Sequence, residues 1–339
     1  MKKALKIIGI IFLAIVIIII TAILTGYFYL NGKLSKMQQV NIDENNLSVD
    51  TAVEEQLTGY RNIALFGVDS RDNDLGEGNR SDCIIIASIN NDTKEINLVS
   101  VYRDTYVDIE GYGLDKITHA YSYGGPELAL KTLNKNLDLN IKEFVTVNFD
   151  AVADAVDALG GVDIRIEEDE IPYVNSAIKD TAKHTGLEAE YINSAGMQTL
   201  NGVQAVGYSR VRYTEGGDYR RTERMRTVIE AMFKKLKDKS ISEINDFADE
   251  ILPEVYTNLE PNEVISLAPT MLTYKMKESI GWPYKTRGIT TDRWYGVPVT
   301  LEENVKQLHK EIFGETDYTV SETVKEISED IINETGYTN

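Results

Sequence analysis

Arg61-Asn-Ile-Ala-Leu-Phe-Gly-Val68 is the stretch that decides the fold. It is short, apolar and followed by turn-forming residues, which predicts a buried β-strand. Two further apolar runs rich in β-branched residues, 83–90 and 96–102, are separated by the polar segment 91–95. Such a pair predicts a β-hairpin, so we expect a sheet that begins near residue 61.

Helical segments alternate with strands beyond this hairpin. Gly124-Gly-Pro126 places proline at the favoured first turn of a helix over 127–137, and residues 144–149 alternate as a strand. Candidate N-cap residues for three later helices are Asp150, Asn201 with Gln204 as its capping-box partner, and Asp218. The alternation predicts one α/β domain over residues 59–314, followed by an acidic, peripheral tail over 315–339.

Composition excludes several classes of protein. The 339 residues carry 35 Lys+Arg and 54 Asp+Glu, a formal net charge of −19, and 42% are hydrophobic. A disordered chain is excluded, and a nucleic-acid partner is not expected because such proteins normally present a basic face. Cys83 is the single cysteine, which excludes an intramolecular disulfide and cysteine-based zinc fingers.

The N-terminal region predicts a membrane anchor. Residues 7–30 carry no charged side chain, and a helix of this length can cross a bilayer. A buried core helix and a cleaved signal peptide are the alternatives, but the run is longer than most signal peptides and ends in aromatic residues. We expect a cytoplasmic tail over 1–6, a single-pass anchor over 7–30, a polar tether over 31–58 and an extracellular domain.

Arginine placement is the strongest chemical signal. Six arginines and no lysine lie between positions 210 and 226: Arg210, Arg212, Arg220, Arg221, Arg224 and Arg226. Their planar guanidinium groups grip phosphate through two parallel hydrogen bonds, so the cluster predicts a phosphate-type ligand. The alternative is a solvated helix face with Arg–Glu pairs, which accounts for part of the cluster, and we assign Arg226 to that face.

Paired carboxylates complement the arginines. Asp69 follows the first strand and Asp82 begins the next, so both lie at one sheet edge if the strands are neighbours. That arrangement suits Mg²⁺, with Mn²⁺ as an alternative, held by carboxylates, phosphate oxygens and water. Arg71, Arg80 and Arg103 occupy similar strand-to-loop positions.

Two other motifs are weaker. Ser176-Ala-Ile-Lys179, with His184-Thr-Gly186 and Tyr191-Ile-Asn193, matches the motifs of penicillin-binding enzymes. Those motifs are normally spread over a whole domain, so chance is the better explanation of their crowding here. His119 could act as a general base, but a lone histidine beside aromatic residues is more often structural.

Taken together, the residues resemble the LytR–CpsA–Psr family of cell-envelope enzymes over about residues 60–314. The matching motifs are Asn62-Ile-Ala-Leu-Phe-Gly-Val-Asp-Ser-Arg71, Arg80-Ser-Asp82, Val99-Ser-Val-Tyr-Arg-Asp104, Asp115-Lys-Ile-Thr-His-Ala-Tyr121, Val147-Asn-Phe-Asp150, Asp157-Ala-Leu-Gly-Gly-Val162, Leu200-Asn-Gly-Val-Gln-Ala205, Tyr208-Ser-Arg-Val-Arg212, Gly217-Asp-Tyr-Arg-Arg-Thr-Glu-Arg224 and Val297-Pro-Val-Thr-Leu-Glu-Glu-Asn304. The resemblance implies a three-layer α–β–α sandwich around a central mixed sheet.

The resemblance also implies a function. Such proteins move a glycopolymer, of the teichoic acid or capsular polysaccharide type, from a polyprenyl-pyrophosphate carrier onto peptidoglycan as a phosphodiester. It implies that Asp69 and Asp82 bind Mg²⁺ and that Arg103, Asp104, Arg210 and Arg212 are catalytic. Asp104 would orient Arg103 or act as a base, and we favour orientation. The pyrophosphate-binding arginines implied are Arg71, Arg80, Arg103, Arg210, Arg212, Arg221 and Arg224.

Three positions depart from the family pattern. Tyr102 stands where proline is usual, Cys83 where threonine is usual, and Met225 where glutamine is usual. Met225 removes an amide contact to a phosphate oxygen or the lipid head, which leaves open a non-catalytic polyprenyl-pyrophosphate binding protein. A lipid pyrophosphatase is the enzymatic alternative, because water could replace the sugar hydroxyl in the same site. A membrane-anchored transcriptional attenuator is a further alternative, disfavoured by the net charge of −19.

Overall fold

The computed structural model describes residues 26, 29, 31–70, 74–260 and 273–338. The expected membrane span over 7–30 therefore lies outside the described residues, apart from Gly26 and Tyr29. Within the described ranges, every helix is too short or too polar to cross a bilayer.

A seven-stranded mixed sheet forms the centre of the molecule, in the order β1-β10-β7-β2-β3-β4-β11. β2 pairs antiparallel with β3 and parallel with β7, while β11 pairs parallel with β4. β3 and β4 pair antiparallel, which confirms the predicted hairpin. The strands are β1 (Gln38–Gln39), β2 (Tyr60–Val68), β3 (Ser81–Asn90), β4 (Glu95–Val101), β7 (Glu143–Asn148), β10 (Tyr256–Thr257) and β11 (Lys275–Trp282).

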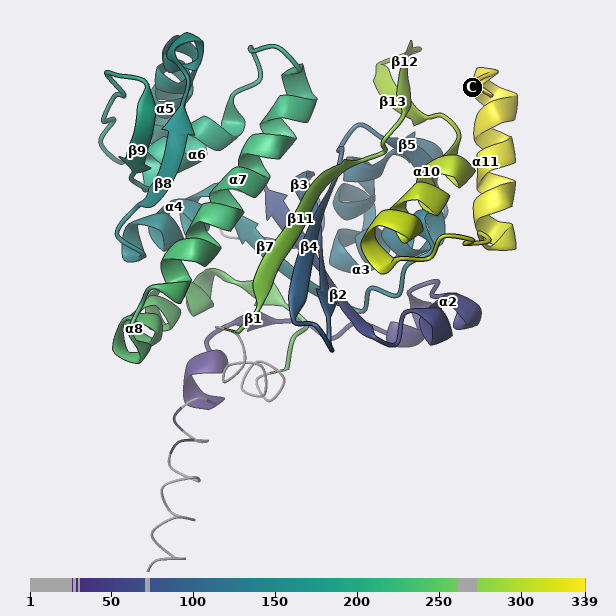
Figure 1. Ribbon diagram of the computed structural model, residues 1–339, viewed down its shortest axis with the longest axis horizontal. Coiled ribbons are helices and arrows are strands. Elements are labelled where there is room, and N and C mark those ends of the chain that lie inside the picture. The colour runs from purple at the N-terminus through teal and green to yellow at the C-terminus, as the bar shows by residue number, and fades with distance from the viewer. Residues whose placement is uncertain (1–25, 27–28, 30, 71–73, 261–272, 339) are drawn as a thin grey trace, which may run out of the picture.

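Helices cover both faces of this sheet (Figure 1). One layer contains α2 (Thr51–Gln56), α3 (Ile117–Leu137), α10 (Leu301–Leu308), the π-helical turn η4 (His309–Phe313) and α11 (Glu322–Thr335). The other contains α4 (Phe149–Ala158), α5 (Ile171–Thr185), α6 (Gly202–Arg210), α7 (Gly217–Lys237) and α8 (Ile241–Ile251). Three short 3-10 turns are η1 (Glu44–Asn46), η2 (Glu168–Glu170) and η3 (Leu252–Glu254). The predicted α/β architecture, a mixed sheet with flanking helices, is confirmed.

In the part of the chain that the structure describes, three two-stranded antiparallel sheets lie outside the central sheet. They are β5 (Tyr106–Ile109) with β6 (Gly113–Lys116), β8 (Val162–Ile166) with β9 (Gly196–Leu200), and β12 (Thr286–Thr290) with β13 (Trp294–Pro298). The β12–β13 hairpin stands at the upper end of the sheet, between β11 and α11 (Figure 1). It approaches the loop after β4, where Thr105 forms a bridge with Gly296.

Several helix boundaries differ from the prediction. α3 begins at Ile117, ten residues early, because Gly124 and Gly125 form a kink within the helix rather than a start. Asn148, not Asp150, caps α4 by accepting a hydrogen bond from the Ala151 N–H. The Asn201–Gln204 capping box is confirmed. α7 follows Gly216, and Asp218 faces neighbouring arginines instead of capping the helix.

Residues 31–58, expected to be a tether, are folded onto the domain. Leu47, Val53 and Leu57 are buried in the main core, and residues 38–39 form an edge strand. Two of the acidic residues in this segment, Asp43 and Asp50, are helix caps: the Asp50 carboxylate accepts hydrogen bonds from the backbone of α2. The tether interpretation missed apolar residues spaced between these caps.

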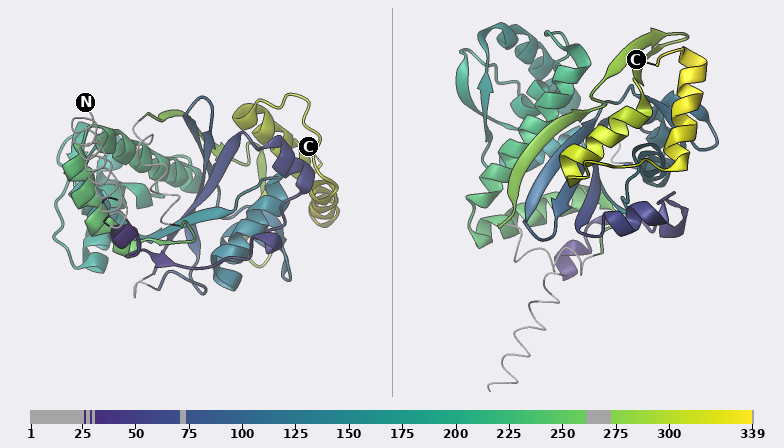
Figure 2. Two further views of the ribbon diagram at one scale, coloured as in Figure 1. Left: turned by 90° about the horizontal axis from the view of Figure 1, so that it is seen from below. Right: turned by 45° about the vertical axis from the view of Figure 1, so that its right-hand side comes forward.

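The acidic segment 315–339 is likewise part of the core rather than peripheral. α11 buries Val324, Ile327 and Ile331 against the layer that contains α3 and α10. Its N-cap Ser321 donates a hydrogen bond to the buried Asp138 carboxylate at 2.6 Å, which ties the helix to the end of α3. Figure 2 shows α11 packed along the side of the domain. Charge on the outer face of an amphipathic helix hid its apolar inner face.

Candidate active site

The site lies at the sheet edge where β2 ends and β3 begins. Val68 pairs with Ser81, so Asp69 and Asp82 emerge from neighbouring strands at the same edge, as the sequence suggested. Both carboxylates line a cavity of about 250 Å³. Arg210, Arg212 and Arg221 line the same cavity, so residues far apart in the chain meet here.

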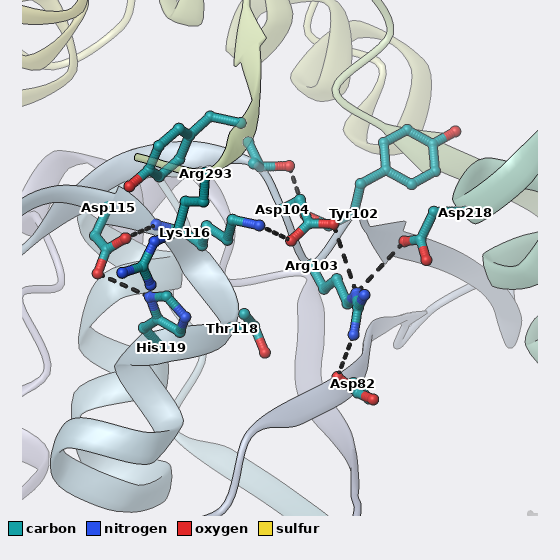
Figure 3. Close-up of polar contacts among 12 residues, drawn as sticks. Asp82, Tyr102, Arg103, Asp104, Asp115, Lys116, Thr118, His119, Asp218 and Arg293 are labelled. Carbon is teal, nitrogen blue, oxygen red and sulfur yellow. Dashed lines mark hydrogen bonds and ion pairs between the residues drawn. The ribbon is translucent and has the colours of Figure 1, made fainter. Parts of the chain in front are cut away.

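Asp82 anchors Arg103. The Arg103 Nη1 lies 2.7 Å from the Asp82 Oδ1, and its Nε lies 3.6 Å from Asp104 and 3.7 Å from Asp218 (Figure 3). The backbone around Arg103 is fixed by the start of α3, where the Thr118 N–H donates to the Arg103 carbonyl. Helix N-terminal N–H groups need such partners, so the loop and the helix satisfy each other.

Two further arginines approach the same carboxylates. The Arg221 Nε lies 3.0 Å from the Asp218 Oδ1, and its Nη1 lies 3.9 Å from the Asp82 Oδ2. Arg212 is more exposed, with its Nη2 3.7 Å from the Asp82 Oδ2. Burial opposes ionisation of Asp82, but Arg103, Arg221 and Arg212 outweigh it and lower its pKa. Asp82 is therefore held as a carboxylate at the centre of three guanidinium groups.

Arg210 reaches the cavity from the last residue of α6. Its guanidinium lies over the Phe149 ring, 5.0 Å from the centroid, and its Nη1 lies 3.3 Å from the Thr181 Oγ1. Neither partner is charged, so its positive charge is not neutralised by these contacts. This makes Arg210 well suited to an anionic ligand.

Asp104 is placed to orient rather than to react. The Lys116 Nζ lies 2.7 Å from the Asp104 Oδ1, and the Asp104 Oδ2 faces the Arg103 Nε. Both carboxylate oxygens therefore face cations of the protein itself. The geometry favours orientation of Arg103, the role preferred from the sequence.

Of the three remaining candidate arginines, the two that the structure describes, Arg224 and Arg80, lie outside the cavity. Arg224 is buried and contacts the Glu170 carboxylate at 2.5 Å and the Val211 carbonyl at 3.2 Å. It therefore holds the turn that carries Arg210 and Arg212, instead of lining the cavity. Arg80 is exposed and does not line the cavity, and Arg71 lies outside the described residues.

Arg226 was assigned to the solvated face of α7, and this assignment is wrong. The residue is only 7% exposed, and its Nε donates to the Ser279 Oγ at 2.8 Å. It packs between α7 and β11, because the apolar stripe of the helix lies beside it. Arg220, which pairs with Glu223 at 2.7 Å, is the arginine that behaves as a solvated residue.

An apolar cavity of about 320 Å³ adjoins the arginine-lined one. It lies between the sheet and α4, α7 and α8, and it shares Phe149 and Met225 with the arginine-lined cavity. Its other apolar walls include Leu65, Val145, Val147, Val152, Val228, Ile229, Met232, Phe233 and Phe247. The family resemblance implies an apolar groove for the lipid, but residue patterns did not predict its walls, although the apolar stripe of α7 beyond Met225 was a usable signal.

The carboxylates fit a hard divalent cation in their chemistry. Asp69 and Asp82 line one cavity together with the arginines, and Mg²⁺ commonly takes one or two carboxylates and completes its shell with phosphate oxygens and water. Among the described residues no three His, Cys, Asp or Glu side chains converge on a common point. Any such ion would thus depend on the bound phosphate for its remaining ligands.

The weaker motifs have structural explanations. His119 lies 2.8 Å from the Asp115 Oδ2, which also accepts a hydrogen bond from the Tyr123 hydroxyl. The serine and lysine of the SxxK match lie on α5, where Ser176 borders the mouth of the arginine-lined cavity. His184 is 3.9 Å from Asp69.

Comparison with known proteins identifies the family. The family model described as the LytR_cpsA_psr family matches residues 24–311. The chain belongs to the LytR–CpsA–Psr family. A LytR–CpsA–Psr relative from Enterococcus faecalis, named polyisoprenyl-teichoic acid–peptidoglycan teichoic acid transferase TagU, is 33% identical over 77% of this chain and 80% of its own length. TagT of Bacillus subtilis, named with the same activity, is 32% identical over 67% of this chain and 70% of its own length.

Solved LytR–CpsA–Psr structures share the fold. TagT bound to LI-WTA superposes with a TM-score of 0.62 at 27% identity, covering 78% of this chain and 93% of TagT. A structure of YwtF (TagT) with bound octaprenyl pyrophosphate lipid superposes with a TM-score of 0.58 at 26% identity, covering 78% and 92%. Octaprenyl pyrophosphate combines an apolar chain with a diphosphate, the two chemistries that the adjoining cavities offer here.

Proposed function

We propose that this protein transfers a glycopolymer, of the teichoic acid or capsular polysaccharide type, from a polyprenyl-pyrophosphate carrier onto peptidoglycan. One observation carries the proposal: the apolar cavity adjoins the arginine-lined cavity, and Phe149 and Met225 line both. A polyprenyl chain fits the first and its pyrophosphate fits the second. Relatives named as teichoic acid transferases support the same reaction.

The reaction is a displacement at phosphorus. A hydroxyl oxygen of the acceptor sugar forms a bond to the glycopolymer-linked phosphorus, and the bond from that phosphorus to the bridging oxygen breaks. The electron pair stays on the departing polyprenyl phosphate, and the hydroxyl proton passes to solvent. Because the transition state is largely dissociative, catalysis depends on positioning and on stabilising charge.

The arginines of the site supply both the positioning and the stabilisation of charge. Arg210 and Arg212 lie two residues apart, and both line the cavity, where they would bind the non-bridging phosphate oxygens. Arg103, fixed by Asp82 and Asp104, would bind the transferred phosphate. Arg221 is buried against Asp218, and its positive charge would help to stabilise the negative charge of the transferred phosphate.

Mg²⁺, or Mn²⁺ in its place, is the proposed metal, held by Asp69 and Asp82. When bound, it would neutralise negative charge on the pyrophosphate oxygens. Asp69→Ala together with Asp82→Ala should abolish metal-dependent turnover. Equal wild-type activity in excess chelator, or full activity in the double variant, would refute the metal role.

A product assay tests the function as a whole. The full chain is incubated with a synthetic polyprenyl-pyrophosphate saccharide, Mg²⁺ and a soluble peptidoglycan oligomer. A phosphodiester-linked saccharide on the oligomer, with released polyprenyl phosphate, is the expected result. Saccharide phosphate and polyprenyl phosphate released without transfer would instead identify a lipid pyrophosphatase, and unchanged lipid would identify a binding protein.

We further propose that residues 7–30 anchor the protein in the cell membrane with the catalytic domain outside. The uncharged run and the preceding lysines support this orientation. Glu55 is exposed on α2, so a Glu55→Cys variant should react with a membrane-impermeant thiol reagent in intact cells. Labelling above the wild-type background only after lysis would refute the orientation.

A further inference from the structure

A third cavity, of about 340 Å³, is lined by Arg103, whose contact with Asp82 joins it to the arginine-lined cavity. Three elements form it: the loop after β4, the first turn of α7 and the β12–β13 hairpin. Its aromatic walls are Tyr102, Tyr219 and Trp294, and its polar walls are Arg103, Asp104 and Asp218.

We propose that this cavity is the acceptor subsite, which binds a pyranose ring of the acceptor glycan and presents its hydroxyl group to the phosphate. The inference rests on the proposed transferase function. It names residues of this chain that would decide how the acceptor, rather than the lipid donor, is recognised.

Trp294 has the geometry of a stacking platform. Its indole lies across two glycines of the hairpin: a Cβ on Gly288 would lie 2.7 Å from the Trp294 Nε1, and one on Gly296 would lie 3.3 Å from its Cη2. Gly288 and Gly296 are cross-strand partners, so the ring can lie against bare backbone. Trp294 is 42% exposed, and the C–H bonds of a sugar ring pack well on the negative face of such an aromatic.

The opposite aromatic wall is fixed in place. The Tyr102 and Tyr219 rings meet edge to face, with centroids 4.4 Å apart. The Tyr219 hydroxyl lies 2.8 Å from the Thr286 Oγ1, which ties α7 to the hairpin. A cavity held open by these contacts needs little rearrangement to accept a ring.

The polar side of the cavity offers groups that sugar hydroxyls bind. Asp104 and Asp218 supply carboxylate acceptors, and both are half-buried. The Arg103 Nε is buried without a hydrogen-bond partner among the described residues, because both carboxylates lie beyond hydrogen-bond distance. A sugar hydroxyl in the cavity would donate to one of the two carboxylates, whose oxygens only accept.

The order of the three cavities favours the acceptor over the sugar of the donor. The apolar cavity shares residues with the arginine-lined one, and the Arg103–Asp82 contact links the arginine-lined one to the third. An in-line displacement needs the attacking oxygen opposite the leaving group. If the polyprenyl phosphate leaves on the apolar side, the attacking sugar enters on the side of Trp294.

Intrinsic fluorescence tests binding without requiring turnover. The chain has two tryptophans, and Trp282 is fully buried, so a change in exposure is reported by Trp294. Titrating the full chain in detergent with a soluble, uncross-linked peptidoglycan glycan oligomer should shift its emission to the blue and saturate. Trp294→Phe should lose this shift. No shift in the wild type, or the same shift in Trp294→Phe, would overturn the proposal.

Transfer kinetics test which substrate the cavity holds. Trp294→Ala should raise the KM for the peptidoglycan oligomer by about tenfold, the loss of one aromatic contact, and leave the KM for the lipid donor unchanged. Trp294→Phe should recover much of the loss. Tyr191→Ala is the control, because Tyr191 is also exposed but lines none of these cavities.

The outcomes separate this inference from the proposed function. A raised donor KM in Trp294→Ala would place the donor sugar here and overturn the proposal, as would an unchanged acceptor KM. A wild-type protein that binds the oligomer but transfers nothing would refute the transferase function and leave the subsite supported by the fluorescence titration.

Discussion

Arg221 and Arg224 lie one turn apart on α7, and each is only 1% exposed, yet their surroundings differ completely. Arg221 contacts Asp218 and Asp82, two carboxylates that border cavities. Arg224 contacts Glu170 and a backbone carbonyl inside the helical layer. Burial and residue type therefore do not distinguish a ligand-binding arginine from a structural one, whereas the position of its partners does.

The largest expected effect is on stability, at Arg224. Arg224→Ala strands the buried Glu170 carboxylate, so the free energy of unfolding should fall by about 3–5 kcal/mol. Denaturant unfolding measures this fall, and adding Glu170→Gln should restore part of it. Unchanged stability with lost transfer would mean that Arg224 acts at the site and that the comparison fails.

Arg212→Lys tests an arginine of the ligand-binding kind. Arg212 is 44% exposed, so its loss should leave the free energy of unfolding within about 0.5 kcal/mol of wild type. Lysine keeps the charge but not the forked geometry, so the transfer rate should fall by a factor of roughly 10–100, equivalent to about 1.5–3 kcal/mol. A stable variant with wild-type transfer would remove Arg212 from the site.

Arg226→Lys should have an intermediate effect of the structural kind. It removes the hydrogen bond to the Ser279 Oγ within a buried contact, so we expect a loss of about 1–2 kcal/mol in the free energy of unfolding. Affinity for the lipid pyrophosphate should stay unchanged in an equilibrium binding assay. Weakened lipid binding without loss of stability would show that β11 and α7 act on the site.

Arg220→Lys should be nearly silent. Its ion pair with Glu223 is exposed, and such pairs contribute about 0–1 kcal/mol. Unfolding and transfer assays should both match wild type. A large loss of transfer here would show that the Arg220 guanidinium is required although it lies outside the arginine-lined cavity, and would contradict the comparison.

The sequence predicted the sheet better than it predicted the residues that hold the site in position. The apolar strands and the Asn201–Gln204 capping box are local patterns, and they are found where expected. The partner of Arg224 is not local, since Glu170 lies 54 residues away and meets it only through the packing of the helical layer. The spacing of residues along α7 alone does not show that Arg221 lines the cavity and Arg224 does not.

Similar reasoning explains the folded termini and the cavities. Asp43 and Asp50 raised the polarity of residues 31–58, although both serve as caps for short helical turns. The apolar cavity draws its walls from the strands β2, β3 and β7 and from four separate helices, so no single segment of the sequence shows it. Motif resemblance supplied what periodicity could not, namely that Arg103 belongs with Arg210 and Arg212.

A crystal structure of this protein with octaprenyl pyrophosphate tests the central claim most directly. The account predicts the prenyl chain between the sheet and α7, and the diphosphate within hydrogen-bond distance of Arg210 and Arg212. Trp294 should remain free for the acceptor. A diphosphate bound elsewhere, for example at the exposed Arg220, or a prenyl chain outside the apolar cavity, would contradict it.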